Sequence, residues 1–208
     1  MSDLLLWLDV ETTGLDPSED WIVEVGCLLT TLDGHEVGES FEVVVAADEV
    51  ITARLDSPEG RYARDMHARS GLLDAMASPD ALPWPDALTA LRDWVHDHAR
   101  RAHLAGFSVH FDRSFLQHHA PKVLRALHHR QLDVTSLELA RRAAGFGPLR
   151  TPGKPAHRSM DDCRAALRVY RHWLERCQQA EAAADLTPEA DPEPEPAHAS
   201  LELCSEGC

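Results

Sequence analysis

The chain has 208 residues, 44% of them hydrophobic, which is enough to bury the core of one domain. No stretch approaches the roughly 18 apolar residues that a membrane span needs, and no basic segment precedes a long apolar one, so we expect neither a membrane protein nor a secreted one. The five cysteines lack the spacing of a disulfide framework, which favours the reducing cytoplasm.

The formal net charge of -15 is concentrated at one end of the chain. Eight of the 35 acidic residues lie in residues 181–208, which contain no Lys or Arg, so the remainder is much less acidic and remains compatible with a nucleic-acid partner. Residues 179–208 mix Pro, Glu and Ala with few bulky side chains, and such a composition buries too little apolar area to fold. We therefore expect a folded domain over 1–178 and a disordered acidic tail over 179–208, either a solubilising extension or a binding segment for an unidentified partner.

Three segments rich in aliphatic residues open the chain and predict an antiparallel meander. They cover residues 4–10, 21–32 and 40–47, with the turn-forming pair Asp33-Gly34 between the last two. After a polar stretch that contains prolines, helices are predicted over 86–101, 112–120, 135–144 and 159–178, and strands over 102–109 and 131–134. The order predicts an α/β fold, with a mixed sheet flanked by helices.

The first predicted strand ends in two carboxylates, Asp9 and Glu11, within the stretch WLDVETTGLDP. Residues two apart in a strand point to the same face, so these carboxylates lie side by side and repel each other. A cation between them would stabilise the pair, and hard oxygen ligands suit Mg²⁺ or Mn²⁺. An exposed strand end that leads into a turn at Asp16-Pro17 explains the same residues without a metal.

Two further acids lie at predicted helix starts. Asp112 follows a strand, where a carboxylate either faces a cleft or caps the amides of the helix. Asp162 lies five residues after His157, and the spacing from Ser159 to Asp162 also matches a capping box. Each acid has a structural explanation of its own, but no such explanation covers their combination with the two carboxylates of the first strand.

This combination resembles the DEDDh family of 3′-to-5′ exonucleases, which has a ribonuclease H-like fold. The motifs are D-x-E on the first strand, an Asp before a helix in mid-chain, and H-x-x-x-x-D near the end. Within that family the chain is most similar to the oligoribonucleases, which hydrolyse very short RNA. The supporting stretches are MHARSGL (66–72), GFSVHFDRSFL (106–116), LDVTSLELARR (132–142) and HRSMDDCRAAL (157–167), in family order across residues 4–173.

The resemblance implies two divalent ions, Mg²⁺ or Mn²⁺, bound by Asp9, Glu11, Asp112 and Asp162. Two ions roughly 3.5–4 Å apart stabilise both the attacking and the leaving oxygen in hydrolysis of a phosphodiester. His157 would then act as general base on the attacking water, since an imidazole exchanges its proton near neutral pH. A loop histidine without a chemical role is the alternative for His157, and its spacing to Asp162 favours the catalytic role.

Substrate contacts are also implied by the resemblance. Leu15 and His67 match positions that lie against the terminal bases, where stacking need not read the sequence; core packing is the alternative for Leu15. Ser108, Arg130 and Thr135 match a cap over the 5′ phosphate that favours very short substrates. A surface charge is the alternative for Arg130.

Three residues depart from the oligoribonuclease pattern. Thr12 stands where Met is usual, and the resulting ETTGL is shared with proofreading-type exonucleases. His129 stands where Tyr is usual, next to the expected substrate contact Arg130, and Gln131 follows. His129 can still stack on a base, although over a smaller area. These departures affect the preference for dinucleotides and leave the metal chemistry unchanged.

The sequence thus leads to the hypothesis of a cytoplasmic exoribonuclease that acts on short single-stranded RNA. The resemblance also implies a homodimer in which the segment of His129 and Arg130 contributes to the partner subunit's site. A general DEDDh exonuclease acting on DNA or longer RNA is the alternative, and Thr12 favours it. A non-catalytic scaffold that binds nucleic acid is a third reading, and the presence of all four acids and His157 disfavours it.

Overall fold

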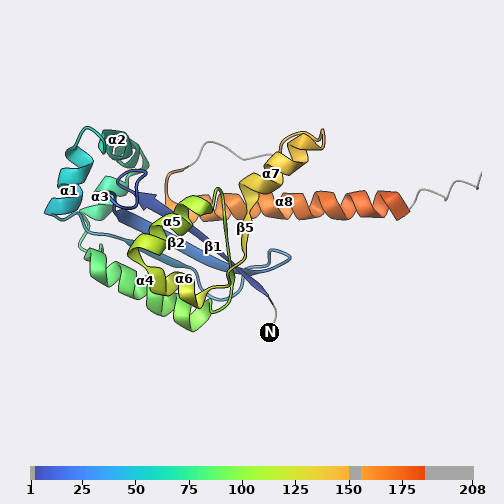
Figure 1. Ribbon diagram of the computed structural model, residues 1–208, viewed down its shortest axis with the longest axis horizontal. Coiled ribbons are helices and arrows are strands. Elements are labelled where there is room, and N and C mark those ends of the chain that lie inside the picture. Colours follow the sequence, from blue (N-terminus) through green and yellow to red (C-terminus); the bar gives the residue numbers. More distant parts are fainter. Residues whose placement is uncertain (1–2, 150–155, 186–208) are drawn as a thin grey trace, which may run out of the picture.

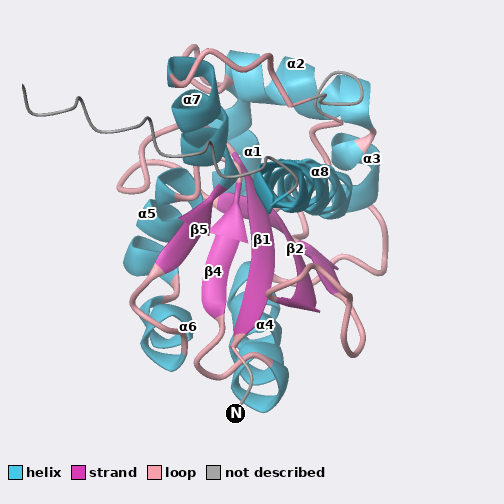
Figure 2. Ribbon diagram, turned by 90° about the vertical axis from the view of Figure 1, so that its right-hand side faces the viewer, coloured by secondary structure: helices cyan, strands magenta, loops and turns pink. Residues whose placement is uncertain are grey.

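The computed structural model describes residues 3–149 and 156–185. A five-stranded sheet has the strand order β3-β2-β1-β4-β5, with β1, β2 and β3 antiparallel and with β4 and β5 parallel to β1. Figure 2 shows β5, β4, β1 and β2 side by side in this order. This is the predicted meander followed by parallel strands. The elements are β1 (Leu4–Thr12), β2 (Ile22–Thr31), β3 (Phe41–Val44), α1 (Glu49–Asp56), α2 (Arg61–Ser70), α3 (Leu72–Met76), α4 (Trp84–His98), β4 (His103–Gly106), α5 (His110–His119), α6 (Pro121–Ala126), β5 (Gln131–Asp133), α7 (Val134–Ala143) and α8 (Ser159–Asp185).

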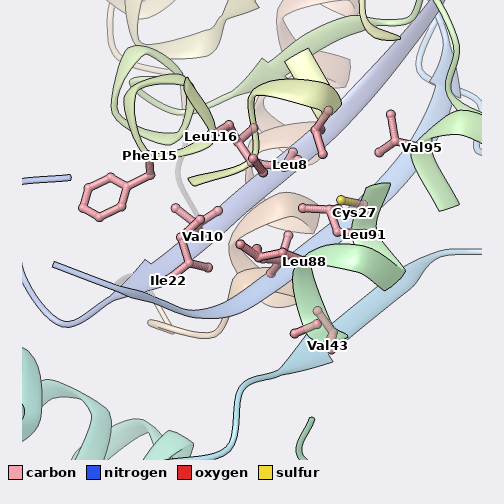
Figure 3. Packing of buried hydrophobic residues seen from close by; sticks show 14 of the residues in the cluster. Leu8, Val10, Ile22, Cys27, Val43, Leu88, Leu91, Val95, Phe115 and Leu116 are labelled. Atoms are coloured by element: carbon pink, nitrogen blue, oxygen red, sulfur yellow. The ribbon is translucent and has the colours of Figure 1, made fainter. Parts of the chain in front are cut away.

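Side chains of β1 alternate between the two faces of the sheet. Leu8 and Val10 pack in the larger core with residues of α4 and α5 (Figure 3), whereas Leu5 and Trp7 pack in a second core with residues of α8. Helices therefore cover both faces, and Figure 2 shows α8 above the sheet and α4 and α6 below it. Alternate residues of a strand share a face, so Asp9 and Glu11, which follow Trp7 at alternate positions, lie on the side of the sheet that α8 covers.

The helix α4 follows its sequence pattern closely. Leu88, Leu91 and Val95 recur at helical spacing and are buried against the sheet, and each contributes roughly 1.5–3 kcal/mol by leaving water (Figure 3). The helix begins at Trp84, two residues before the predicted start. Pro85 is tolerated in its first turn, because a backbone N–H at that position would have no hydrogen-bond partner within the helix and its absence costs nothing. The helix ends at His98.

Four helices lie where none was predicted, namely α1, α2, α3 and α6. Each is short and buries few residues; α1 buries only Ile51 and Leu55 and is capped by Asp48, whose carboxylate accepts the Ile51 N–H at 2.8 Å. Helices as short as α1, α3 and α6 show too little apolar periodicity to be read from the sequence, and α2, although ten residues long, buries only Ala63 and His67. Pro121 ends the predicted helix 112–120 as expected, but it also begins α6.

The last helix is longer than its predicted range of 159–178. It continues to Asp185, so the first residues of the expected tail are helical, and its exposed end projects from the domain (Figure 1). Residues 186–208 lie outside the described residues, so disorder in that part of the tail stays a prediction. Over residues 3–149 and 156–185, none of the helices combines the length and the apolar character that crossing a membrane requires.

Candidate active site

A cleft of about 630 Å³ opens at the C-terminal end of β1. Residues of β1, the turn after it, α1, α2, the start of α5 and the start of α8 line its walls. All five residues that the sequence selected for chemistry lie in this lining, and they come from three separate parts of the chain: Asp9, Glu11, Asp112, His157 and Asp162. The fold therefore brings together the complete predicted set.

Three of these side chains form the tightest cluster. One ligand atom from each of Glu11, His157 and Asp162 lies within 4.8 Å of the other two. Ligand atoms on a single Mg²⁺ stand about 2.0–2.1 Å from the ion, so two of them are at most about 4 Å apart. The cluster therefore needs to close only slightly around a cation.

Asp112 reaches the site because β4 is short. The predicted strand 102–109 is reduced to His103–Gly106, which pairs with β1 only as far as Trp7. Beyond this point the Asp112 carboxylate accepts a hydrogen bond from the Val10 backbone N–H at 3.0 Å, with only 3% of the residue exposed. The alternative of a helix cap is wrong, because no side chain caps the start of α5.

Asp162 fixes the turn that carries His157. Its two carboxylate oxygens accept the N–H groups of His157 at 3.0 Å and of Ala156 at 3.1 Å. His157 has a φ of +54°, a backbone conformation that costs a residue other than glycine about 1–3 kcal/mol and persists only when its surroundings impose it. The predicted capping box is not formed, since the Ser159 hydroxyl has no hydrogen-bond partner among the described residues.

Burial and mutual repulsion make these acids hard to ionise. Burial is the main reason that the pKa of Glu11 rises to about 8, and repulsion from neighbouring acids, Asp162 first, adds to it. Burial also raises the pKa of Asp112 to about 7, and burial together with repulsion from Asp112 raises the pKa of Asp9 well above its usual range. Carboxylates that repel one another inside a cleft fit a site that a divalent cation completes.

Comparison with known proteins agrees with this chemistry. A family model described as Exonuclease matches residues 6–170, a span that contains all five residues. The oligoribonuclease of Corynebacterium diphtheriae is 38% identical over 192 residues, covering 88% of this chain and 90% of that protein. The oligoribonuclease of Streptomyces avermitilis is 34% identical over 180 residues, covering 84% and 87%. This chain belongs to the oligoribonuclease family of exonucleases.

Solved structures show the same fold as this oligoribonuclease family member. Exonuclease I from Methylocaldum szegediense matches with a TM-score of 0.62 at 21% identity, over 85% of this chain and 41% of that one. The zinc-bound complex of E. coli ExoI with single-stranded DNA matches with a TM-score of 0.63 at 15% identity, over 88% and 43%. The chain thus spans less than half the length of these exonucleases, and the likeness confirms the ribonuclease H-like α/β fold.

Two groups of predicted substrate contacts lie at the cleft of this oligoribonuclease family member. Leu15 is 83% exposed and lines the cleft, so the alternative of core packing is wrong for this residue. Ser108 also lines the cleft, and its N–H donates to the hydroxyl of Thr135 at 3.0 Å and to Asp133 Oδ1 at 3.1 Å. The structure therefore brings Ser108 and Thr135 together.

His67 is not exposed to the cleft. Its ring is fully buried, and Nε2 donates a hydrogen bond to the carbonyl oxygen of Thr12 at 2.8 Å. His67 therefore presents no surface to a base in this structure, and its contact with a base stays a prediction. Three other residues of α2 line the cleft instead, namely Tyr62, Ala63 and Met66, and Tyr62 is 75% exposed. Tyr62 and Met66 are four residues apart and so share a helix face, which was the one signal in the sequence that could have selected them.

His129 and Arg130 lie away from the cleft of their own chain. Both are exposed, and neither is part of its lining. They precede β5, whose other end carries Asp133 beside Ser108. Arg130 and the pair formed by Ser108 and Thr135 thus occupy opposite ends of this strand.

Proposed function

We propose that this protein is a 3′-to-5′ exoribonuclease that hydrolyses short oligoribonucleotides to mononucleotides. The observation that carries the proposal is the cluster of Glu11, His157 and Asp162, within a cleft that Asp9 and Asp112 also line. The relatives named oligoribonuclease, matched over 80–90% of their own lengths, support the substrate class.

Asp9, Glu11, Asp112 and Asp162 would hold two divalent ions, either Mg²⁺ or Mn²⁺. Bound there, the ions supply positive charge to the attacking and leaving oxygens of the phosphodiester. His157 accepts the proton of the attacking water, because its imidazole lies among the ligand acids. The carboxylate of Asp162 holds the backbone of His157 and so keeps this base at the reaction centre.

The walls of the cleft support a short, single-stranded substrate. The exposed side chains of Leu15 and Tyr62 offer an apolar and an aromatic surface for bases, and such surfaces accept any base. The hydroxyls of Ser108 and Thr135, 3.2 Å apart, are suited to a terminal phosphate. A cleft of about 630 Å³ has the size of a pocket for a small ligand, which favours an oligonucleotide of few residues.

We also propose that the protein is a homodimer in the cytoplasm. The exposure of His129 and Arg130 at the end of β5 away from Ser108 supports a contribution of these residues to the partner subunit's cleft. Light scattering that returns a monomer at micromolar concentration would remove the shared site. The free thiols of Cys27, Cys163 and Cys177 support a reducing compartment.

The decisive experiment measures hydrolysis of 5′-labelled RNA and DNA, as dinucleotides and as longer oligomers, with Mg²⁺, with Mn²⁺ and with a chelator. We expect RNA dinucleotides to be hydrolysed fastest and the chelator to stop the reaction. Asp162→Asn should abolish hydrolysis. The matched control is Asp161→Asn, which changes an exposed acid on the same helix and should retain it.

The same experiment separates the alternatives. Stepwise shortening of long DNA or RNA without preference for dinucleotides would identify a general 3′-to-5′ exonuclease, as Thr12 favours. Hydrolysis at the parent rate by Asp162→Asn would exclude the proposed site. Binding of RNA without any hydrolysis would indicate a scaffold.

A further inference from the structure

Glu24 is a buried carboxylate outside the proposed set of metal ligands. It lies on β2 directly opposite Glu11 of β1 and is fully buried. Its carboxylate accepts two hydrogen bonds at the start of α8, from Arg158 Nε at 2.9 Å and from the Ser159 N–H at 2.8 Å. Arg158 Nη2 also forms an ion pair with it at 2.7 Å. Bonds between an ionised donor and an ionised acceptor are about twice as strong as neutral ones.

A second contact docks the same segment on β2. Gly26 lies two residues beyond Glu24, and a Cβ atom there would come within 2.7 Å of the Met160 nitrogen. Only glycine therefore lets the start of α8 approach the strand this closely. The thiol of Cys163 adds a bond to the Gly26 carbonyl oxygen at 3.4 Å. The first turn of α8 is thus held on the strand by a charged pair and by backbone packing.

His157 stands between two anchors. On one side Asp162 accepts its N–H at 3.0 Å, and on the other side the next residue, Arg158, is bound to Glu24. The left-handed backbone of His157 needs such anchors, because a residue other than glycine does not adopt it unaided. Arg158 is only partly exposed, with 28% of its side chain accessible, and it directs its guanidinium toward β2.

We propose that Glu24 and Arg158 are positioning residues whose ion pair sets the turn that aims His157 into the cleft. The pair acts through the backbone of residues 157–159 and touches neither the substrate nor the reacting atoms. This proposal rests on the proposed function, since it assigns His157 as the general base. Loss of the pair should therefore slow the chemical step while substrate binding is maintained.

The kinetic test compares Arg158→Gln with the parent and with a matched control. Displacing a catalytic group by about 1 Å can cost on the order of 10²-fold in rate, so we expect Arg158→Gln to lower kcat for an RNA dinucleotide by about 10- to 100-fold, with KM changed by less than about 3-fold. Arg158→Lys should recover part of the loss. The control is Arg171→Gln, which removes two guanidinium bonds from the same helix to the Gly34 carbonyl oxygen, away from the cleft, and should leave kcat unchanged.

The second readout needs neither substrate nor metal. Amide hydrogen–deuterium exchange of residues 156–163 in the metal-free protein should be about tenfold faster in Arg158→Gln and unchanged in Arg171→Gln. If the parent fails to hydrolyse RNA dinucleotides, the proposed function is wrong, and exchange still decides whether the pair orders this segment. Unchanged exchange would overturn the positioning role, whether kcat falls or not, because a fall alone would mean that Arg158 acts in another way, such as through its positive charge near Glu11.

Arg158→Gln leaves the Glu24 charge buried without its partner, which can prevent folding. In that event Glu24→Gln combined with Arg158→Met removes both charges and keeps an acceptor for the Ser159 N–H. The double variant is then judged by the same two readouts. A parent-like kcat together with parent-like exchange would again overturn the proposal.

Discussion

The ring of His67 donates a hydrogen bond from Nε2 to the carbonyl oxygen of Thr12, at 2.8 Å, from a fully buried position. A carbonyl only accepts, so Nε2 carries the proton and Nδ1 of the neutral ring does not. Nδ1 lies 3.8 Å from Glu11 Oε2 and has no hydrogen-bond partner in the described part of the chain. His67 is therefore a buried residue that holds the last residue of β1, Thr12, by a hydrogen bond.

Replacing this ring should cost stability before it costs substrate affinity. His67→Ala removes a hydrogen bond, leaves the Thr12 carbonyl without its partner and opens a cavity, so we expect the free energy of unfolding to fall by about 2–4 kcal/mol. Urea denaturation measures this change. Met66→Ala, on the neighbouring residue at the cleft wall, should cost less. If His67→Ala were as stable as the parent but had a raised KM, the result would support the predicted contact between His67 and a base.

The metal-free protein should become less stable as the pH rises. Glu11 and Asp112 have pKa values raised to about 8 and about 7, against roughly 4 in an unfolded chain. Between these values the folded state binds more protons than the unfolded state, so the free energy of unfolding falls from about pH 4 to about pH 8. Thermal unfolding in chelator across this range measures the slope, and Asp112→Asn should flatten it.

Divalent cations should reverse this loss. At pH 8, Mg²⁺ or Mn²⁺ at about 100 times its dissociation constant should add about 2.7 kcal/mol to the free energy of unfolding. Asp162→Asn should reduce the gain, whereas Asp161→Asn, on the exposed neighbour, should not. If the melting temperature changed neither with pH nor with added metal, these acids would not form a metal site.

Tyr62 should contribute to substrate binding through its exposed ring. Stacking on a base is worth about 1–3 kcal/mol, so Tyr62→Ala should raise KM for a dinucleotide by about 5- to 100-fold, and Tyr62→Phe should not. Steady-state kinetics on RNA dinucleotides measures this. The control is Leu139→Ala, which removes an exposed apolar side chain of α7 outside the cleft. An unchanged KM for Tyr62→Ala would leave the ring without a role in binding.

The Asp20 carboxylate should stabilise the turn that carries Leu15 at neutral pH. It accepts hydrogen bonds from the Arg54 Nε at 2.7 Å, the Asp16 N–H at 2.9 Å and the Thr13 hydroxyl at 3.0 Å. Burial raises the pKa of Asp20, but these bonds, that from Arg54 first, outweigh it and lower the pKa below its ordinary value. The stabilisation is therefore complete above about pH 4 and is lost as the pH falls through the lower, folded value.

Asp20→Asn tests this pH dependence. The variant should lose about 1–3 kcal/mol of unfolding free energy at pH 7, and its difference from the parent should shrink below about pH 4. Urea denaturation at pH 7 and pH 3 gives both values. Glu59→Gln is the control, because Glu59 is an exposed acid 3.9 Å from Arg54 Nη1 and such surface pairs are worth little. An equal difference at both pH values would show that the charge of Asp20 has no part in it.

Short-range patterns placed four of the five candidate residues, and the family resemblance combined them with Asp112 into one proposed set. Alternation along the first strand places Asp9 and Glu11 on one face, and the spacing of His157 and Asp162 places both at one helix start. All of these residues line one cleft in the structure. Local spacing fixes such relationships, because each depends only on the geometry of a single element or turn.

Relationships across the chain could not be predicted in the same way. The orientation of His67 depends on which face of α2 packs under β1, and the reach of Asp112 depends on the point at which β4 stops pairing. The bond between Arg158 and Glu24 joins residues 134 positions apart. Tertiary packing determines all three of these contacts, and hydrophobic periodicity in the sequence does not predict them.

The order in which the chain supplies its site also governs when a newly made molecule becomes a nuclease. Asp9 and Glu11 emerge from the ribosome with the first strand, whereas His157 and Asp162 arrive with the last helix. A nascent chain without α8 lacks both the proposed base and the fourth acid of the proposed site, however well its earlier strands have paired. We therefore expect hydrolysis of RNA only after α8 has been synthesised.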